Sequence, residues 1–230
     1  MNSILELKKM SYRYEGARKT VVKNASAEFS GGKIYTVIGK SGSGKSTLLS
    51  IIAGLDVCTG GDILFNGDSL KTIDRDDYRA KSIGVVFQGY NLLTNATAVE
   101  NIVLSMHISG SRQTAKKAFA YGLLERVGID RETADRKILQ LSGGEQQRVG
   151  IARAISHDPD LIIADEPTGN LDGETTDEIL DILISLAHHD GKCVIIATHS
   201  KKVTSVADEI WSMKEGTLSF LKSNRSPNRR

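Results

Sequence analysis

Four short apolar runs limit the folds that this chain can adopt. Each is four or five residues long, and they are Ile34 to Ile38, Ile83 to Phe87, Leu161 to Ala164 and Val194 to Ala197. A continuous apolar run suits a strand that is buried on both faces, as in a parallel sheet. The segment from Glu174 to His188 instead carries apolar residues at helical spacing. Strands that alternate with helices in this way predict an α/β fold.

Two other patterns indicate additional parts. Ile4 to Met10 and Ala25 to Phe29 alternate apolar and polar residues, which is typical of an antiparallel sheet with one face in solvent. The stretch from about Asn91 to His157 has helical periodicity and no convincing strand, so it is predicted to be a helical insertion. We expect a single domain over residues 1–221 that contains this insertion, followed by a basic, solvated tail from Lys222 to Arg230.

The composition excludes several classes of protein. The 230 residues carry a net charge of only +2, which argues against a protein that coats nucleic acid, and we expect no nucleic-acid partner. Two cysteines, Cys58 and Cys193, are too few for a disulfide framework, fit a reducing compartment and are expected to be buried thiols. No apolar region resembles a signal peptide or reaches the length of about 18 residues that a membrane-spanning helix needs. The sequence therefore predicts a soluble, cytoplasmic protein.

The octapeptide Gly39 to Ser46, Gly-Lys-Ser-Gly-Ser-Gly-Lys-Ser, lies between the first apolar run and a helical pattern at Thr47 to Ala53. This spacing matches the phosphate-binding P-loop. Its glycines let backbone amides face an anion at a helix N-terminus, Lys45 is placed to reach the β and γ phosphates, and Ser46 is placed to bind a magnesium ion. The expected nucleotide contacts in this segment are Gly39, Ser41, Gly42, Ser43, Gly44, Lys45, Ser46 and Thr47.

The third apolar run ends in two adjacent carboxylates, Asp165 and Glu166. Ligands bind at strand ends in open α/β sheets. Because consecutive strand residues point to opposite faces, we expect the two side chains to have different roles. Asp165 is assigned to the magnesium ion, and Glu166 to the attacking water as general base.

A second glycine-containing turn occurs at Leu141 to Arg148, which reads Leu-Ser-Gly-Gly-Glu-Gln-Gln-Arg. A serine, permissive glycines and the free amides of a helix start predict another anion site. An N-cap serine alone would explain Ser142 but would leave the two glycines unexplained.

This octapeptide, its position after the P-loop and the Asp165–Glu166 strand that follows resemble the nucleotide-binding subunits of ABC transporters. The resemblance covers the whole chain except the basic tail. It implies a P-loop NTPase (RecA-like) core with a mostly parallel sheet, an N-terminal antiparallel β subdomain and a helical subdomain that bears the signature octapeptide. It also implies ATP and Mg²⁺ as cofactors, and hydrolysis of ATP as the reaction.

The resemblance also implies roles for residues that spacing alone does not identify. Gln88 is similar to the Q-loop glutamine, which contacts the magnesium ion and the attacking water, and His199 is similar to the switch histidine at the γ phosphate. Asp172 matches the D-loop. Tyr14 is similar to the aromatic residue that stacks on adenine, although Tyr12 is close enough to compete.

Partners follow from the same resemblance. Each ATP would lie between the P-loop of one copy and Ser142 and Gly144 of another, which implies a homodimer. Other implied partners are a separate transmembrane permease and, through it, a periplasmic or extracellular adaptor, with the chain peripheral on the inner face of the membrane. The stretches Gln88 to Leu93, Thr97 to Ile102 and Asp165 to Asp172 resemble the ATPases of lipoprotein release, macrolide export and antimicrobial-peptide resistance. A cell-division ATPase that regulates cell-wall hydrolysis is also similar, so this alternative stays open.

Other nucleotide-binding classes fit less well. A translation-factor ABC protein would carry two nucleotide domains, and a DNA-repair ATPase a long coiled coil between the P-loop and the signature. A GTPase would need an Asn-Lys-x-Asp base reader, and the sequence contains no Asn-Lys pair. The P-loop also lacks the third glycine at the spacing of a dinucleotide-binding fingerprint.

Overall fold

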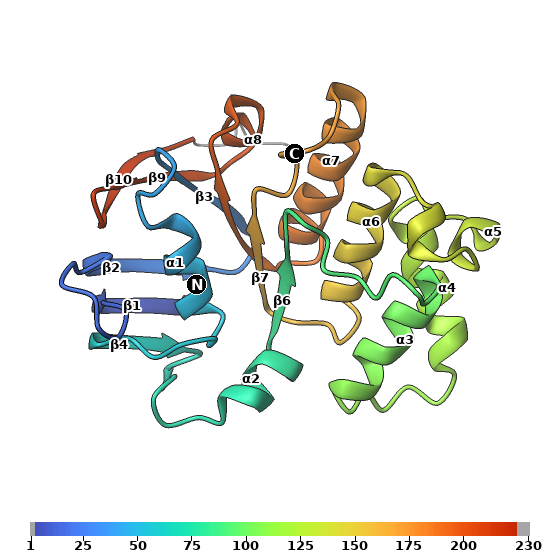
Figure 1. Cartoon of the computed structure of the whole chain (residues 1–230), viewed down its shortest axis with the longest axis horizontal. Coiled ribbons are helices and arrows are strands. Elements are labelled where there is room, and N and C mark those ends of the chain that lie inside the picture. The colour runs from blue at the N-terminus through green and yellow to red at the C-terminus, as the bar shows by residue number, and fades with distance from the viewer. Residues whose placement is uncertain (1–2, 225–230) are drawn as a thin grey trace.

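The computed structural model describes residues 3–224 of the chain. Its larger sheet has six strands in the order β10-β9-β3-β8-β7-β6 (Figure 1). The strands are β3 (Lys33–Ile38), β6 (Ile83–Val86), β7 (Leu161–Asp165), β8 (Cys193–Thr198), β9 (Glu209–Lys214) and β10 (Thr217–Ser223). All neighbours in this sheet are parallel except β9 and β10, which are antiparallel. The predicted α/β fold with a mostly parallel sheet is therefore confirmed.

A four-stranded antiparallel sheet, β2-β1-β4-β5, packs beside the larger one. Its strands are β1 (Ser3–Tyr12), β2 (Val22–Ser30), β4 (Gly60–Phe65) and β5 (Asp68–Ser69). Leu5, Leu7 and Met10 of β1 are buried while most residues between them are not, as the alternating pattern predicts. Helix α1 (Lys45–Ile52) lies between the two sheets (Figure 1).

The strands of the parallel sheet are buried on both faces, which explains their continuous apolar runs. Ile163 and Ile195 pack with α1 and the antiparallel sheet, whereas Ile162 and Ile196 pack with helices α6 (Gly143–Ala154) and α7 (Gly173–His188). Both cysteines are buried and free. Outside the helical subdomain, the described residues also form helices α2 (Arg75–Lys81) and α8 (Lys201–Ser205).

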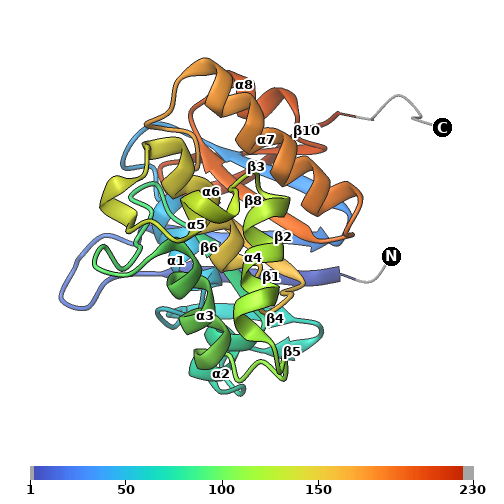
Figure 2. The same cartoon turned by 90° about the vertical axis from the view of Figure 1, so that its right-hand side faces the viewer.

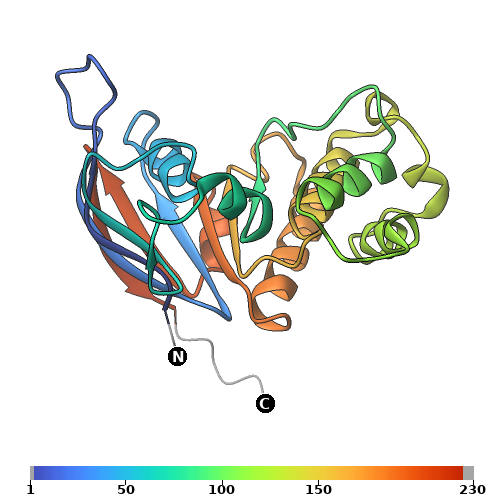
Figure 3. The same ribbon diagram turned by 90° about the horizontal axis from the view of Figure 1, so that it is seen from below.

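The helical subdomain occupies one end of the molecule (Figures 2 and 3). It contains α3 (Ala98–Ile108), α4 (Lys116–Arg126), α5 (Arg131–Ala134), a short 3-10 helix, η1 (Ile138–Gln140), and α6. Across the described part of this stretch, the only β pairing is the isolated bridge between Thr97 and Lys137. The helical subdomain that the fold class requires is therefore present.

Two expected boundaries are wrong. Strand β10 continues to Ser223, so Lys222 and Ser223 belong to the sheet because they pair with Ile210 and Glu209 of β9. The rest of the expected tail, after Asn224, lies outside the described residues. Helix α1 starts at Lys45 instead of Thr47. No helix between residues 3 and 224 is long and apolar enough to cross a membrane.

Candidate functional site

A cavity of about 620 Å³ opens where strands β3 and β7 end and helix α1 begins. Residues from widely separated parts of the sequence line it. They are Val21, Gly39, Lys40, Ser41, Gly42, Gly44, Lys45, Ser46, Thr47, Gln88, Asp165, Glu166 and His199. The fold thus brings together most of the site residues predicted from the sequence, at the strand ends where α/β proteins bind ligands.

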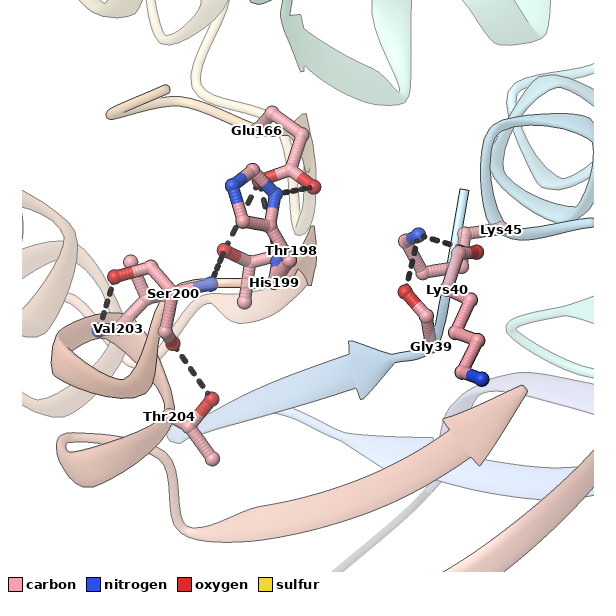
Figure 4. Close-up of polar contacts among 9 residues, drawn as sticks. All are labelled: Gly39, Lys40, Lys45, Glu166, Thr198, His199, Ser200, Val203 and Thr204. Carbon is pink, nitrogen blue, oxygen red and sulfur yellow. Dashed lines mark hydrogen bonds and ion pairs between the residues drawn. The ribbon is translucent and has the colours of Figure 1, made fainter. Parts of the chain in front are cut away.

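The P-loop combines backbone freedom with unpaired helix amides. Gly42 and Gly44 have left-handed φ values of 73° and 108°, which side-chain-bearing residues rarely adopt. Gly44 is the N-cap of α1 and provides no side-chain cap, so the first amides of the helix remain available to an anion. Lys45 donates from Nζ to the carbonyls of Gly39 at 2.8 Å and Lys40 at 3.4 Å (Figure 4).

Two P-loop residues have an additional or different structural role. A Cβ at Gly39 would lie 2.4 Å from the carbonyl oxygen of Met213 on β9, so glycine is required here for packing as well as for access. Ser43 does not line the cavity. Its Oγ is buried, and it has no hydrogen-bond partner among the described residues.

Asp165 and Glu166 line the same cavity, which differs from the opposite faces expected of consecutive strand residues. The reason is that β7 ends at Asp165 and Glu166 takes a left-handed backbone conformation with φ of 46°. Asp165 Oδ1 is buried and lacks a hydrogen-bond partner in the described structure. Since buried polar atoms are nearly always paired, this oxygen is available to a ligand.

The Glu166 carboxylate is held by the last residue of β8 and the residue that follows it (Figure 4). Its Oε2 accepts hydrogen bonds from Thr198 Oγ1 at 3.1 Å and from the His199 amide at 3.3 Å. Its Oε1 lies 2.8 Å from Nδ1 of His199. The Glu166 side chain is 14% exposed and the His199 side chain 74%. The carboxylate is therefore fixed, while the imidazole it orients faces solvent.

Gln88 joins the cavity to the helical subdomain. Its amide packs on the turn after β7, where a Cβ at Gly169 would lie 3.0 Å from Gln88 Nε2. The following residues Tyr90 and Asn91 both have positive φ values, 59° and 51°. Arg153 of α6 donates to the carbonyl oxygens of both residues, and its burial lowers its pKa. The Gln88 segment is thus tied to helix α6.

The signature turn lies on α6 and does not line this cavity. Ser142 caps the helix, with its Oγ accepting from the Glu145 amide at 3.2 Å while Glu145 accepts from the Ser142 amide at 2.7 Å. A Cβ at Gly143 would lie 2.9 Å from Tyr90 Oη, and one at Gly144 would lie 2.4 Å from Thr175 Cγ2. A side chain at either position would therefore require Tyr90 or Thr175 to move, a packing effect that the sequence does not reveal.

Asp172 is also outside the cavity and caps helix α7. Its Oδ1 accepts from the Thr175 amide at 2.8 Å, and this hydrogen bond is the main cause that lowers the Asp172 pKa. Thr175 thus lies next to two helix starts. Its amide donates to Asp172 at the start of α7, and its side chain packs against Gly144 at the start of α6.

The two tyrosines considered for base stacking differ in exposure. Tyr12 is 4% exposed and its hydroxyl is hydrogen-bonded to Asp56, which raises the pKa of Tyr12 to about 12. Tyr14 is 49% exposed, and its hydroxyl lies 3.0 Å from Thr47 Oγ1. Only Tyr14 of this pair presents a ring beside the P-loop helix. Val21 also lines the cavity, and Thr198 holds Glu166, although no signal in the sequence assigns either residue to the site.

A glycine loop between β3 and α1, together with the two carboxylates at the end of β7, defines a P-loop nucleotide-binding fold. The ABC transporter family model matches residues 22–169, and the chain belongs to this family. It is 42% identical to the uncharacterised ABC transporter ATP-binding protein YclH of Bacillus subtilis, over 90% of this chain and 91% of that protein. This likeness extends beyond the cavity to almost the entire chain.

The chain is also similar to proteins whose names state a transport system. The lipoprotein-releasing system ATP-binding protein LolD of Hyphomonas neptunium is 40% identical over 95% of this chain and 97% of its own length. The macrolide export ATP-binding/permease protein MacB of Mannheimia succiniciproducens is 38% identical over 94% of this chain, which spans 34% of that longer protein. These relatives match the subfamily that the sequence motifs indicated.

Solved structures confirm the fold. The dimeric bacterial ABC transporter cassette MJ0796 superposes with a TM-score of 0.85 at 33% identity, covering 96% of this chain and 100% of that one. The same cassette has been solved in a post-hydrolysis state bound to ADP and Pi.

Proposed function

We propose that this chain binds and hydrolyses ATP as the nucleotide-binding subunit of an ABC transporter. The observation that carries the proposal is the single cavity in which a P-loop meets Gln88, Asp165, Glu166 and His199. These groups supply phosphate-binding amides, metal-binding oxygens and a carboxylate base, which are the parts that phosphoryl transfer to water requires.

The phosphates of ATP bind the amides of the loop from Gly39 to Thr47, and Lys45 supplies the positive charge beside the β and γ phosphates. The exposed ring of Tyr14 stacks on adenine, since Tyr12 is buried and engaged with Asp56.

Ser46, Gln88 and Asp165 would hold Mg²⁺. The described residues contain no group of three or more His, Cys, Asp or Glu side chains that could bind a metal ion. A few protein oxygens together with substrate phosphates suit Mg²⁺, and the orphaned Asp165 Oδ1 provides one of them. When bound, the ion neutralises charge that develops on the phosphates.

Glu166 acts as general base on the attacking water. Its hydrogen bonds with Thr198 and His199 fix the direction of the carboxylate, and His199, which lines the same cavity, would contact the γ phosphate. A positioned carboxylate of this kind contributes about 10²–10⁴-fold to a rate.

A second copy of the chain completes each site. Ser142, Gly144 and Asp172 lie outside the P-loop cavity of their own chain, and the similar cassette MJ0796 is dimeric. In a two-fold dimer each copy gives its signature turn to the nucleotide of the other, so ATP binding stabilises association and hydrolysis weakens it.

The membrane partner is a separate permease, and the work done is export or mechanical transmission across the membrane. The names of LolD and MacB support this assignment. Docking to the permease would place the chain on the inner face of the membrane, with any periplasmic or extracellular adaptor bound through the permease. The cell-division regulator remains the second candidate. The identity of the permease that co-purifies with a tagged copy of this chain distinguishes the two.

Equilibrium ATP binding tests the nucleotide site directly. Lys45→Ala removes the ammonium group at the phosphates, and we expect at least a tenfold loss of ATP affinity because a charge-assisted contact is lost. Lys117→Ala, on the exposed surface of α4, is the matched control and should bind as the wild type does. Equal affinities of the wild type and Lys45→Ala would contradict the proposed site.

A further inference from the structure

A second cavity, of about 760 Å³, adjoins the nucleotide cavity on the side of α8 and β9. The two cavities share Gly39, Lys40 and His199. The remaining lining comes from the end of β3, from α8 and β9, and from the end of β10 with Asn224, and no motif accounts for it. The second cavity therefore lies beside the P-loop, and most of its lining residues are not part of the nucleotide cavity.

The charge of this second cavity is entirely positive. Its lining includes Lys40, Lys201 and Lys222, and it includes no Asp or Glu. No hydrogen bond or ion pair engages these three ammonium groups within residues 3–224. Other lysines nearby are paired, because Lys202 lies 2.7 Å from Asp177 and Lys33 lies 2.9 Å from Glu209. Unpaired like charges around one concavity raise its affinity for anions.

The neighbouring carboxylate Asp208 does not neutralise the lysines. It accepts from the Ile34 amide at 2.7 Å and lies 2.9 Å from His188 Nε2. No carboxylate in the lining of this cavity is thus paired with the three lysines.

The fold places the three lysines on separate elements around the cavity, Lys40 in the P-loop, Lys201 at the start of α8 and Lys222 in β10. Figure 4 shows the Lys40 side chain pointing away from the Lys45 amine, so the two lysines of the P-loop do not serve one phosphate. Asn224 anchors the end of β10 beside α8, donating from its amide to Asp208 O at 2.7 Å and from Nδ2 to Ala207 O at 2.9 Å. This anchor keeps Lys222 at the cavity.

We propose that this second cavity is an oxyanion site, separate from the nucleotide site, that binds phosphate or another phosphate-bearing anion through Lys40, Lys201 and Lys222. Three ammonium groups without a carboxylate favour a multivalent anion, because each adds a charge-assisted hydrogen bond. The site does not depend on whether the chain hydrolyses ATP.

Equilibrium dialysis of radiolabelled inorganic phosphate tests the proposal on the full chain. A saturating non-hydrolysable ATP analogue with Mg²⁺ fills the first cavity, and its own binding is measured first, so a failure of the proposed nucleotide site is seen separately. We expect one further phosphate per chain, with an affinity that falls as salt is added.

A pair of double variants gives the test its specificity. Lys201→Ala/Lys222→Ala should weaken phosphate binding by about tenfold, since two contacts are lost. Lys117→Ala/Lys137→Ala removes the same charge from the exposed surface of the helical subdomain and should leave it unchanged. Absence of saturable phosphate binding, or an equal loss in both double variants, would overturn the proposal.

Single-turnover kinetics identify the source of the anion. If the site receives product phosphate, Lys201→Ala/Lys222→Ala delays phosphate release relative to hydrolysis. If release and hydrolysis stay synchronous while the dialysis result holds, the site is filled from solution.

Discussion

At the scale of single residues, the conformation of Glu166 decides the chemistry of the site. An extended Glu166 would point to the opposite face from Asp165, and its left-handed backbone instead places both carboxylates at one cavity. The sequence indicates both residues by their position at a strand end, but it does not indicate this turn. The role of Asp165 follows from a single atom, because its buried Oδ1 has no hydrogen-bond partner in the described structure and is available to a ligand.

Asp165→Asn should therefore affect metal-dependent binding specifically. We expect the Mg²⁺ concentration that supports ATP binding to rise by at least about tenfold, because a neutral amide oxygen replaces a carboxylate ligand. Binding of ATP in EDTA should change little. Titration of ATP affinity with Mg²⁺ measures both effects. Asp181→Asn, exposed on α7, is the control, and an unchanged Mg²⁺ requirement in Asp165→Asn would remove Asp165 from the metal site.

At the scale of elements, close contacts between helices and strands connect the site to the helical subdomain. Helix α6 approaches α7 through Gly144 and Thr175, and His157, just after α6, lies 2.9 Å from the carbonyl oxygen of Ile83 on β6. Sequence patterns predict such elements because they depend on local spacing. They do not predict the contacts between them, which join residues far apart in the chain.

Gly144→Ala tests the α6–α7 contact. A Cβ there would lie 2.4 Å from Thr175 Cγ2, and overpacking of this kind costs about 1–3 kcal/mol of unfolding free energy. Thr175→Ser removes the obstructing methyl group, so the double variant Gly144→Ala/Thr175→Ser should recover most of the loss. Gly122→Ala is the control, because nothing lies within 4 Å of its Cβ position. Urea unfolding measures all four proteins, and a Gly144→Ala variant as stable as the wild type would contradict the contact.

His157 gives the β6–α6 contact a pH dependence. Burial is the main cause that lowers the His157 pKa, so the folded state disfavours the charged imidazole. The stability that the neutral ring contributes is fully present above its unfolded pKa of about 6.5 and is lost as the pH falls below it. In His157→Gln this part of the acid sensitivity should disappear. Urea unfolding at pH 8 and pH 5.5 compares the two proteins, and an equal stability difference between the two pH values in both would contradict the argument.

At the scale of the whole molecule, the P-loop and the signature turn lie in different parts of one chain. Figure 3 shows the green and yellow helical segments at the opposite end from the strands of the antiparallel sheet, and the cavity contains no signature residue. The sequence predicts the presence of both half-sites through their glycines. It does not predict that Gly143 and Gly144 pack closely against Tyr90 and Thr175, or that β10 extends to Ser223, because those features depend on distant neighbours.

The most direct measurement of the central proposal compares ATP turnover and ATP-dependent self-association in Glu166→Gln. We predict that this variant binds Mg²⁺-ATP, forms a stable dimer in light scattering, and hydrolyses ATP at least about 100-fold more slowly than the wild type. Glu125→Gln, exposed on α4, should behave as the wild type. Hydrolysis by Glu166→Gln at the wild-type rate would contradict the assignment of Glu166 as the base.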